Sequence, residues 1–119
     1  MESRNSKVRE RTHRLAVNVV KRVRFLQREK KDLAVTRQLL RAITSVDANV
    51  EEGWAQQSRK AFAAKMAMAL QDAERARHWL RRLHDAGDLG GRGAERLLED
   101  CEELIRLLAS VAGPAMVSR

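Results

Sequence analysis

Apolar residues recur at spacings of three, four or seven through four successive stretches of this chain, and this is the period of an amphipathic helix. In the first stretch they are Val8, Leu15, Val19, Val23 and Leu26. The composition agrees, because 119 residues with no Tyr, two Phe, two Trp, one Pro and six Gly offer little material for sheets and their turns. The length suits one domain. We therefore expect an all-α protein.

Charged or glycine-containing breaks separate these stretches and predict the helix boundaries. Gly53 ends the second stretch, Ser58 offers a hydroxyl to cap the third helix, and Gly87 supplies a left-handed residue that ends it. Residues 90–93, rich in glycine, are expected in the last loop. The expected helices are about residues 4–28, 33–53, 58–86 and 94–112. Because the links are short, the prediction is an antiparallel up-down four-helix bundle in a single domain.

Positive charge is concentrated in the first third of the chain. Residues 1–41 hold 13 basic and 4 acidic groups, whereas residues 42–119 hold 11 basic and 12 acidic groups. The cations of the first helix follow its period on a face away from the apolar stripe, which predicts a basic ridge. The candidate nucleic-acid-binding residues are Arg4, Lys7, Arg11, Arg14, Lys21 and Arg22. Such a ridge suits the phosphate backbone of RNA or DNA, although a solvated helix face has the same pattern.

A polar line accompanies the apolar stripe of the second helix. Arg41, Ser45, Asn49 and Glu52 follow at spacings of four, four and three, which places them on one face. This pattern predicts a partly buried polar network. If the second helix lies at a subunit seam, Asn49 and Glu52 would satisfy groups across it and fix the register.

Catalytic and metal-binding patterns are not found in the sequence. Glu74 and His78 are four residues apart rather than three, and no second copy of the pair occurs, so we expect no metal site and no cofactor. Cys101 lies on the apolar stripe of the fourth helix, where its thiol is expected to be buried and unactivated. A single Cys and no signal peptide or membrane-spanning run favour a cytoplasmic protein that is not a membrane protein. Because no catalytic constellation is found, we expect that it is not an enzyme.

The segment from Ser45 to Gly53 resembles the four helix bundle protein family. That family includes proteins encoded in intervening sequences of bacterial 23S ribosomal RNA genes and is related to the accessory variability proteins of diversity-generating retroelements. Its members typically carry Ser, an aliphatic residue, Pro or Gly, a small residue and Asn, and three positions after the Asn they carry Glu-Gly. The aligned residues here are Ser45, Val46, Asp47, Ala48, Asn49, Glu52 and Gly53. Asp47 stands where the family usually has Pro or Gly, so the second helix is expected to run straighter.

Two further segments carry the same resemblance. Residues 58–62, which begin with Ser58 and end with Phe62, are similar to the family's start of the third helix, and Trp79 with Leu80 is similar to its Tyr-Trp-Leu segment. The resemblance covers residues 33–86 and implies a homo-oligomer, a pentamer. Because the retroelement relatives bind nucleic acid and a reverse transcriptase, it also implies a reverse transcriptase as a partner.

Two functions therefore remain open at this point. The first is a non-enzymatic oligomeric accessory or adaptor protein that binds nucleic acid without reading sequence, through the basic surface of its first helix. The second is a structural or protein-interaction ring with no nucleic-acid role, in which the charges confer solubility. The sequence leaves open RNA against DNA and the number of subunits.

Overall fold

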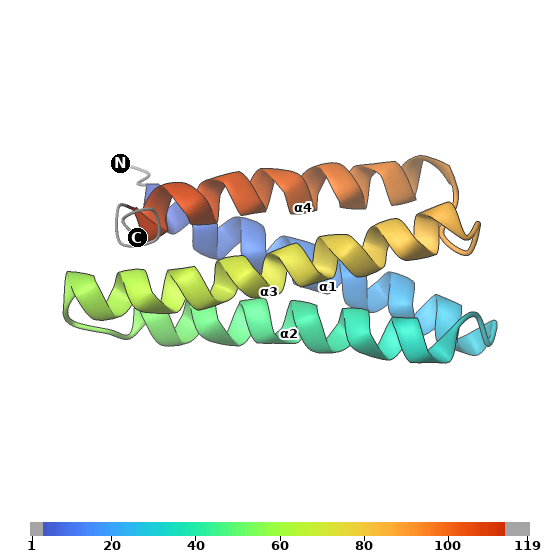
Figure 1. Cartoon of the computed structure of the whole chain (residues 1–119), viewed down its shortest axis with the longest axis horizontal. Helices are drawn as coiled ribbons and strands as arrows, with labels where there is room; N and C mark the ends of the chain where they lie inside the picture. The colour runs from blue at the N-terminus through green and yellow to red at the C-terminus, as the bar shows by residue number, and fades with distance from the viewer. Residues whose placement is uncertain (1–3, 114–119) are drawn as a thin grey trace.

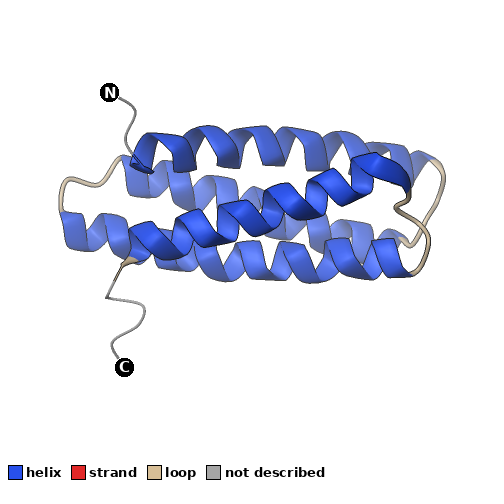
Figure 2. Ribbon diagram, turned by 90° about the horizontal axis from the view of Figure 1, so that it is seen from above, coloured by secondary structure: helices blue, strands red, loops and turns tan. Residues whose placement is uncertain are grey.

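The computed structural model describes residues 4–113, which form four α-helices joined by short turns. The helices are α1 (Arg4–Arg28), α2 (Leu33–Trp54), α3 (Arg59–Asp85) and α4 (Gly91–Ala112). They run alternately up and down, so α1 begins at the end of the bundle where α4 finishes (Figure 1). Each helix packs against its neighbours in sequence, and α4 returns against α1, with the turns at the two ends (Figure 2). The predicted all-α, up-down, antiparallel four-helix bundle is confirmed.

Local sequence signals set the two ends of α3. The Ser58 hydroxyl accepts a hydrogen bond from the backbone N–H of Ala61 at 3.0 Å, and so caps the helix as predicted. At the other end Gly87 has a φ of +84°, a left-handed conformation that glycine adopts without strain. Its N–H donates to the carbonyl of His84 at 3.0 Å, which closes the last turn.

The start of α4 differs from the sequence expectation. The helix begins at Gly91, three residues before the predicted start near residue 94, so the glycine-rich segment is mostly helical. Tertiary contacts outweigh its low helix propensity, because the preceding Leu89 is fully buried and Arg22 of α1 donates from Nη2 to the Gly90 carbonyl at 2.8 Å. The turn before α4 is therefore fixed by packing against α1.

The core lies between the four helices and is built almost entirely of the periodic apolar residues. In α1 the predicted stripe is buried at every position: Val8, Leu15, Val19, Val23 and Leu26. Leu33 opens the second apolar stretch but is not part of the core: it lies six residues before Leu39, off the helical period, and its side chain is 42% exposed at the first residue of α2. The α2–α3 contact is the most extensive in the bundle and the α1–α4 contact the least extensive.

Candidate nucleic-acid interface

Two of the predicted nucleic-acid-binding cations hold α1 against α4. Arg11 donates from Nη1 to the carboxylate of Glu103, and the pair is partly buried between the helices. The guanidinium of Arg22 reaches the turn before α4, where it donates to the Gly90 carbonyl. A Cβ at Gly93 would lie 3.2 Å from Nη1 of Arg22, so the glycine there leaves room for the guanidinium. Both cations therefore have a role within the bundle.

The remaining predicted cations lie on the outer side of α1. Lys7 and Lys21 are exposed and have no ion-pair partner among residues 4–113. Arg14 is exposed and lies 3.7 Å from the carboxylate of Glu10, one turn earlier, an arrangement that contributes little because both groups are in water. The side chain of Arg4 lies outside the described part of the structure.

Arg24 and Arg28 complete this surface, and neither is in the set of predicted binding residues. Both are exposed and, within the described residues, have no ion-pair partner. We call the outward cations of α1 the basic face. It consists of Lys7, Arg14, Lys21, Arg24 and Arg28, at spacings of seven, seven, three and four residues. Those spacings keep all five side chains on one side of a helix.

A groove runs beside the basic face, between α1 and the first half of α4. It has a volume of about 610 Å³ and is lined by Lys21, Arg22 and Phe25 of α1 and by Arg96 and Asp100 of α4. Phe25 is 49% exposed, although it is a large apolar side chain. Arg96 and Asp100 form a loose ion pair at 3.5 Å. The groove thus combines an aromatic ring with three cations and one carboxylate.

The family-motif residues of α2 face α3 of the same chain. Ser45 Oγ and Asn49 Nδ2 donate to Oδ2 of Asp72 at 2.6 Å and 3.0 Å, and Arg75 donates from Nη1 to Oδ1 at 2.8 Å. Asn49 and Asp72 are buried, at 7% and 9% exposed. We call Ser45, Asn49, Asp72 and Arg75 the Asp72 cluster. Of the predicted polar line, Ser45 and Asn49 join this cluster, whereas Glu52 pairs with Lys65 and Arg41 is exposed. The centre of the cluster, Asp72, was missed.

A sequence signal for Asp72 was present. It lies three residues after Ala69 and four before Ala76, both fully buried, so the helical period places a carboxylate on the core side of α3. A buried carboxylate requires donors, and those on the facing stripe of α2 are Ser45 and Asn49. The partner could thus have been inferred once α2 and α3 were paired.

Glu52 and Gly53 also serve the α2–α3 contact. Lys65 Nζ of α3 lies 2.7 Å from the Glu52 carboxylate. Gly53 is buried, and a Cβ built there would lie 3.0 Å from Cβ of Lys65 and 2.5 Å from the terminal carbon of Met66. The absence of a side chain at position 53 lets the two helices approach closely at this point.

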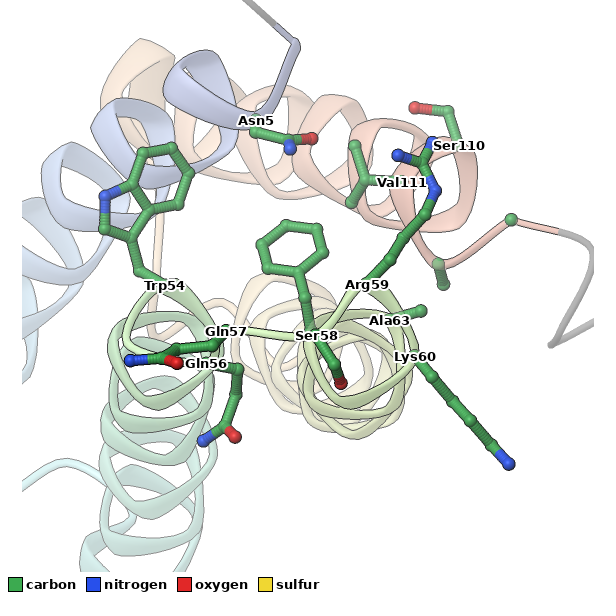
Figure 3. A pocket seen from close by; sticks show the side chains of 13 residues that line it. Asn5, Trp54, Gln56, Gln57, Ser58, Arg59, Lys60, Ala63, Ser110 and Val111 are labelled. Atoms are coloured by element: carbon green, nitrogen blue, oxygen red, sulfur yellow. The ribbon is translucent and has the colours of Figure 1, made fainter.

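The remaining motif residues lie at the turn between α2 and α3 and on α3 itself. A cavity of about 1040 Å³ opens at that turn, and its lining includes Trp54, Ser58 and, from α4, Val111 (Figure 3). Phe62 meets Trp54 edge to face, with ring centroids 6.3 Å apart. Trp79 is partly buried against the core, with its ring 4.7 Å from that of His78. These aromatic residues pack the bundle.

The candidate metal ligands and the single thiol also lie among the described residues. Across residues 4–113 no group of three or more His, Cys, Asp or Glu side chains is arranged to hold a metal ion. Burial raises the pKa of the Cys101 thiol to about 12, and its Sγ lies 3.5 Å from the carbonyl of Ala73. The thiol therefore stays protonated and shielded from solvent. Within the same residues, no helix has the length and apolar character needed to cross a membrane.

Two comparisons with known proteins find similarity along nearly the whole chain. The model of a family described as 23S rRNA-intervening sequence protein matches residues 4–110. A crystal structure of a protein with unknown function from the S23 ribosomal protein family, from Bacteroides thetaiotaomicron, is 30% identical and has a TM-score of 0.85. The match covers 92% of this chain and 98% of that one. No curated protein matches the chain.

Proposed function

Since this chain belongs to the 23S rRNA-intervening sequence protein family, we propose that it is a non-enzymatic accessory or adaptor protein that binds the backbone of RNA or DNA. The basic face of α1 supports the proposal. It presents five exposed cations, and Glu10 is the one carboxylate in the 25 residues of α1. Cations that neutralise phosphates release counterions, and this source of affinity does not depend on base sequence.

The length of the basic face suits a run of phosphates. Lys7 and Arg28 are separated by about 32 Å along the helix axis at 1.5 Å per residue. That distance equals the rise of about nine base pairs of duplex, or of a similar run of stacked single strand. Because four of the five side chains have no partner within residues 4–113, little internal bonding is lost when they contact phosphate.

Assembly would strengthen such a surface. We expect a homo-oligomer, a pentamer by the family resemblance, in which each copy contributes its own basic face. Several weak sites on one nucleic acid then act at high effective concentration. The exposed Met68 on α3 is an apolar side chain that contact with another subunit would cover. The expected compartment is the cytoplasm.

Fluorescence anisotropy tests the proposal with labelled single-stranded RNA, single-stranded DNA and duplex DNA, each at low and near-physiological salt. The variant is Lys7→Gln/Lys21→Gln/Arg24→Gln, which removes three cations of the basic face that make no internal ion pair. We expect weaker binding of all three probes. On duplex DNA we expect a loss of about 3 from the slope of log K against log salt, about one for each phosphate contact.

The matched control removes three exposed cations from α3, in the variant Arg59→Gln/Lys60→Gln/Arg82→Gln. These also have no ion-pair partner within the described residues, so the change in net charge is the same. The control should keep most of the affinity. Equal losses of affinity in both variants would show that binding depends on the net charge of the protein and not on the basic face. A wild-type protein that binds none of the probes at near-physiological salt would overturn the proposal in favour of a structural ring.

A further inference from the structure

Phe25 is the feature of the α1–α4 groove that the basic face does not explain. Nearly half of this ring is exposed to solvent, and leaving a large apolar side chain in water forgoes part of its burial energy. Its neighbours one turn away are Lys21, Arg22 and Arg28 of α1 and Glu29 just after the helix, so three cations and one carboxylate lie beside the ring. Binding of phosphate groups would explain the cations, but it does not explain an exposed aromatic ring among them.

The groove is preformed on one side. Arg22 is fixed by its bond to the Gly90 carbonyl and lies against the first turn of α4 at Gly93. The first turn of α4 has no side-chain cap, so its N–H groups add partial positive charge at the same place. Lys21 and Arg96 add two cations at the walls, and Asp100, in its loose ion pair with Arg96, contributes one negative charge. The groove therefore has a net positive lining.

We propose that this groove takes one unpaired nucleotide of a single-stranded nucleic acid, with the base stacked on Phe25 and its phosphate held by Lys21, Arg22 and Arg96. The inference rests on the proposed function and names its substrate as single strands. A volume of about 610 Å³ accommodates a ligand of this size. A base in a duplex has both faces covered by its neighbours, so only an unpaired base can stack on the ring.

The shape of the site favours nucleic acid over an anionic membrane surface. A membrane anchor needs apolar side chains on a convex face that can enter the lipid. Phe25 instead forms a wall of a groove whose lining also carries Lys21, Arg22 and Arg96, with Asp100 on the facing helix α4. A carboxylate in that position opposes contact with an anionic bilayer, whereas it can accept a hydrogen bond from the amino group of a base.

The test compares the wild-type protein with Phe25→Leu, Phe25→Trp and, as a matched control, Val17→Ala at another exposed apolar site of α1. The probes are a labelled single-stranded RNA of 12 nucleotides, the duplex of the same sequence and vesicles of anionic phospholipid. We expect Phe25→Leu to weaken single-strand binding by about 5- to 150-fold, the range for loss of one stacked base. Duplex affinity and the salt slope should stay unchanged, Phe25→Trp should keep the preference, and Val17→Ala should behave as wild type.

The remaining outcomes separate this inference from the proposed function. If Phe25→Leu binds single strands as wild type does, while loss of the basic face still weakens every probe, the nucleotide site is refuted and the nucleic-acid function stands. Binding to anionic vesicles that depends on Phe25, without any preference for single strands, would also refute the site. A wild-type protein that binds neither nucleic acid at near-physiological salt would refute both.

Discussion

Replacing Asp72 by Ala should destabilise the bundle more than any other single change in its polar cluster. The Asp72 carboxylate accepts from Ser45, Asn49 and Arg75, and Asn49 is 7% exposed at the α2–α3 contact. Without the carboxylate, the Asn49 amide keeps its buried position but loses its acceptor. A polar group left unsatisfied in this way costs about 1–3 kcal/mol.

The other two donors add less to the cost. Ser45 is partly exposed and can turn its hydroxyl towards water, and the side chain of Arg75 is 65% exposed and returns to solvent. We therefore expect Asp72→Ala to lower the free energy of unfolding by about 2–4 kcal/mol, and Arg75→Ala by less than about 1 kcal/mol. For a chain of this length the first value corresponds to a fall in Tm of about 8–16 °C.

Urea denaturation followed by far-UV circular dichroism measures these values at a fixed protein concentration. The double variant Asn49→Leu/Asp72→Ala removes the stranded amide together with the carboxylate, so it should cost about 2 kcal/mol less than the sum of the two single changes. The reasoning is refuted if Asp72→Ala changes the free energy of unfolding by less than about 0.5 kcal/mol. It is also refuted if the effects of Asn49→Leu and Asp72→Ala are additive in the double variant.

Three further changes test other parts of the structure. Thr12 is fully buried, and its hydroxyl has no hydrogen-bond partner among residues 4–113, so Thr12→Val should raise the free energy of unfolding, measured in urea, by about 1 kcal/mol. A decrease in that free energy would show that the hydroxyl is satisfied. Because the pKa of Cys101 is about 12, its thiol should resist a disulfide reagent at neutral pH until the protein is unfolded, and fast native labelling would contradict its burial. The hydrogen-bonded guanidinium of Arg9 lowers the pKa of Glu51 below its ordinary 4.5, so the pair stabilises the bundle above pH 4.5 and this stability is lost as the pH falls through the lowered pKa. Acid titrations of Glu51→Gln should then lose less stability below pH 4.5 than wild type, and identical curves would count against the pair.

The bundle was predictable because its signals are local. The apolar period of α1, the cap at Ser58 and the left-handed Gly87 each depend on neighbours along one helix or turn. The resemblance in residues 45–53 is likewise local, and the family match over residues 4–110 confirms it. The predicted start of α4 was wrong because the tertiary contacts of Leu89 and Arg22 outweigh the low helix propensity of the glycines.

The candidate site was less predictable, because it depends on distances between helices. No spacing within α1 shows that Arg11 meets Glu103, 92 residues later, or that Arg22 reaches the Gly90 carbonyl. The groove beside Phe25 has the same origin, since its opposite wall, Arg96 and Asp100, comes from α4. The sequence supplied the cations, and the packing of α1 on α4 decided which of them remain exposed.

The position of each cation around the axis of α1, relative to the apolar stripe, explains which cations pair within the bundle and which remain exposed. Arg9 lies at one edge of the α1 stripe, where it makes a bidentate pair with Glu51 and approaches the Trp54 ring at 5.3 Å. Arg11 and Arg22 lie at the other edge and contact α4. The basic face is on the side of α1 opposite the stripe, where its cations form no ion pair with α2 or α4 among residues 4–113. In a bundle, cations at the edge of the stripe join neighbouring helices, whereas those opposite it are available to a polyanion. The positions of the cations around the helix therefore decide, more than their number, how much positive charge α1 leaves exposed for the proposed nucleic-acid partner.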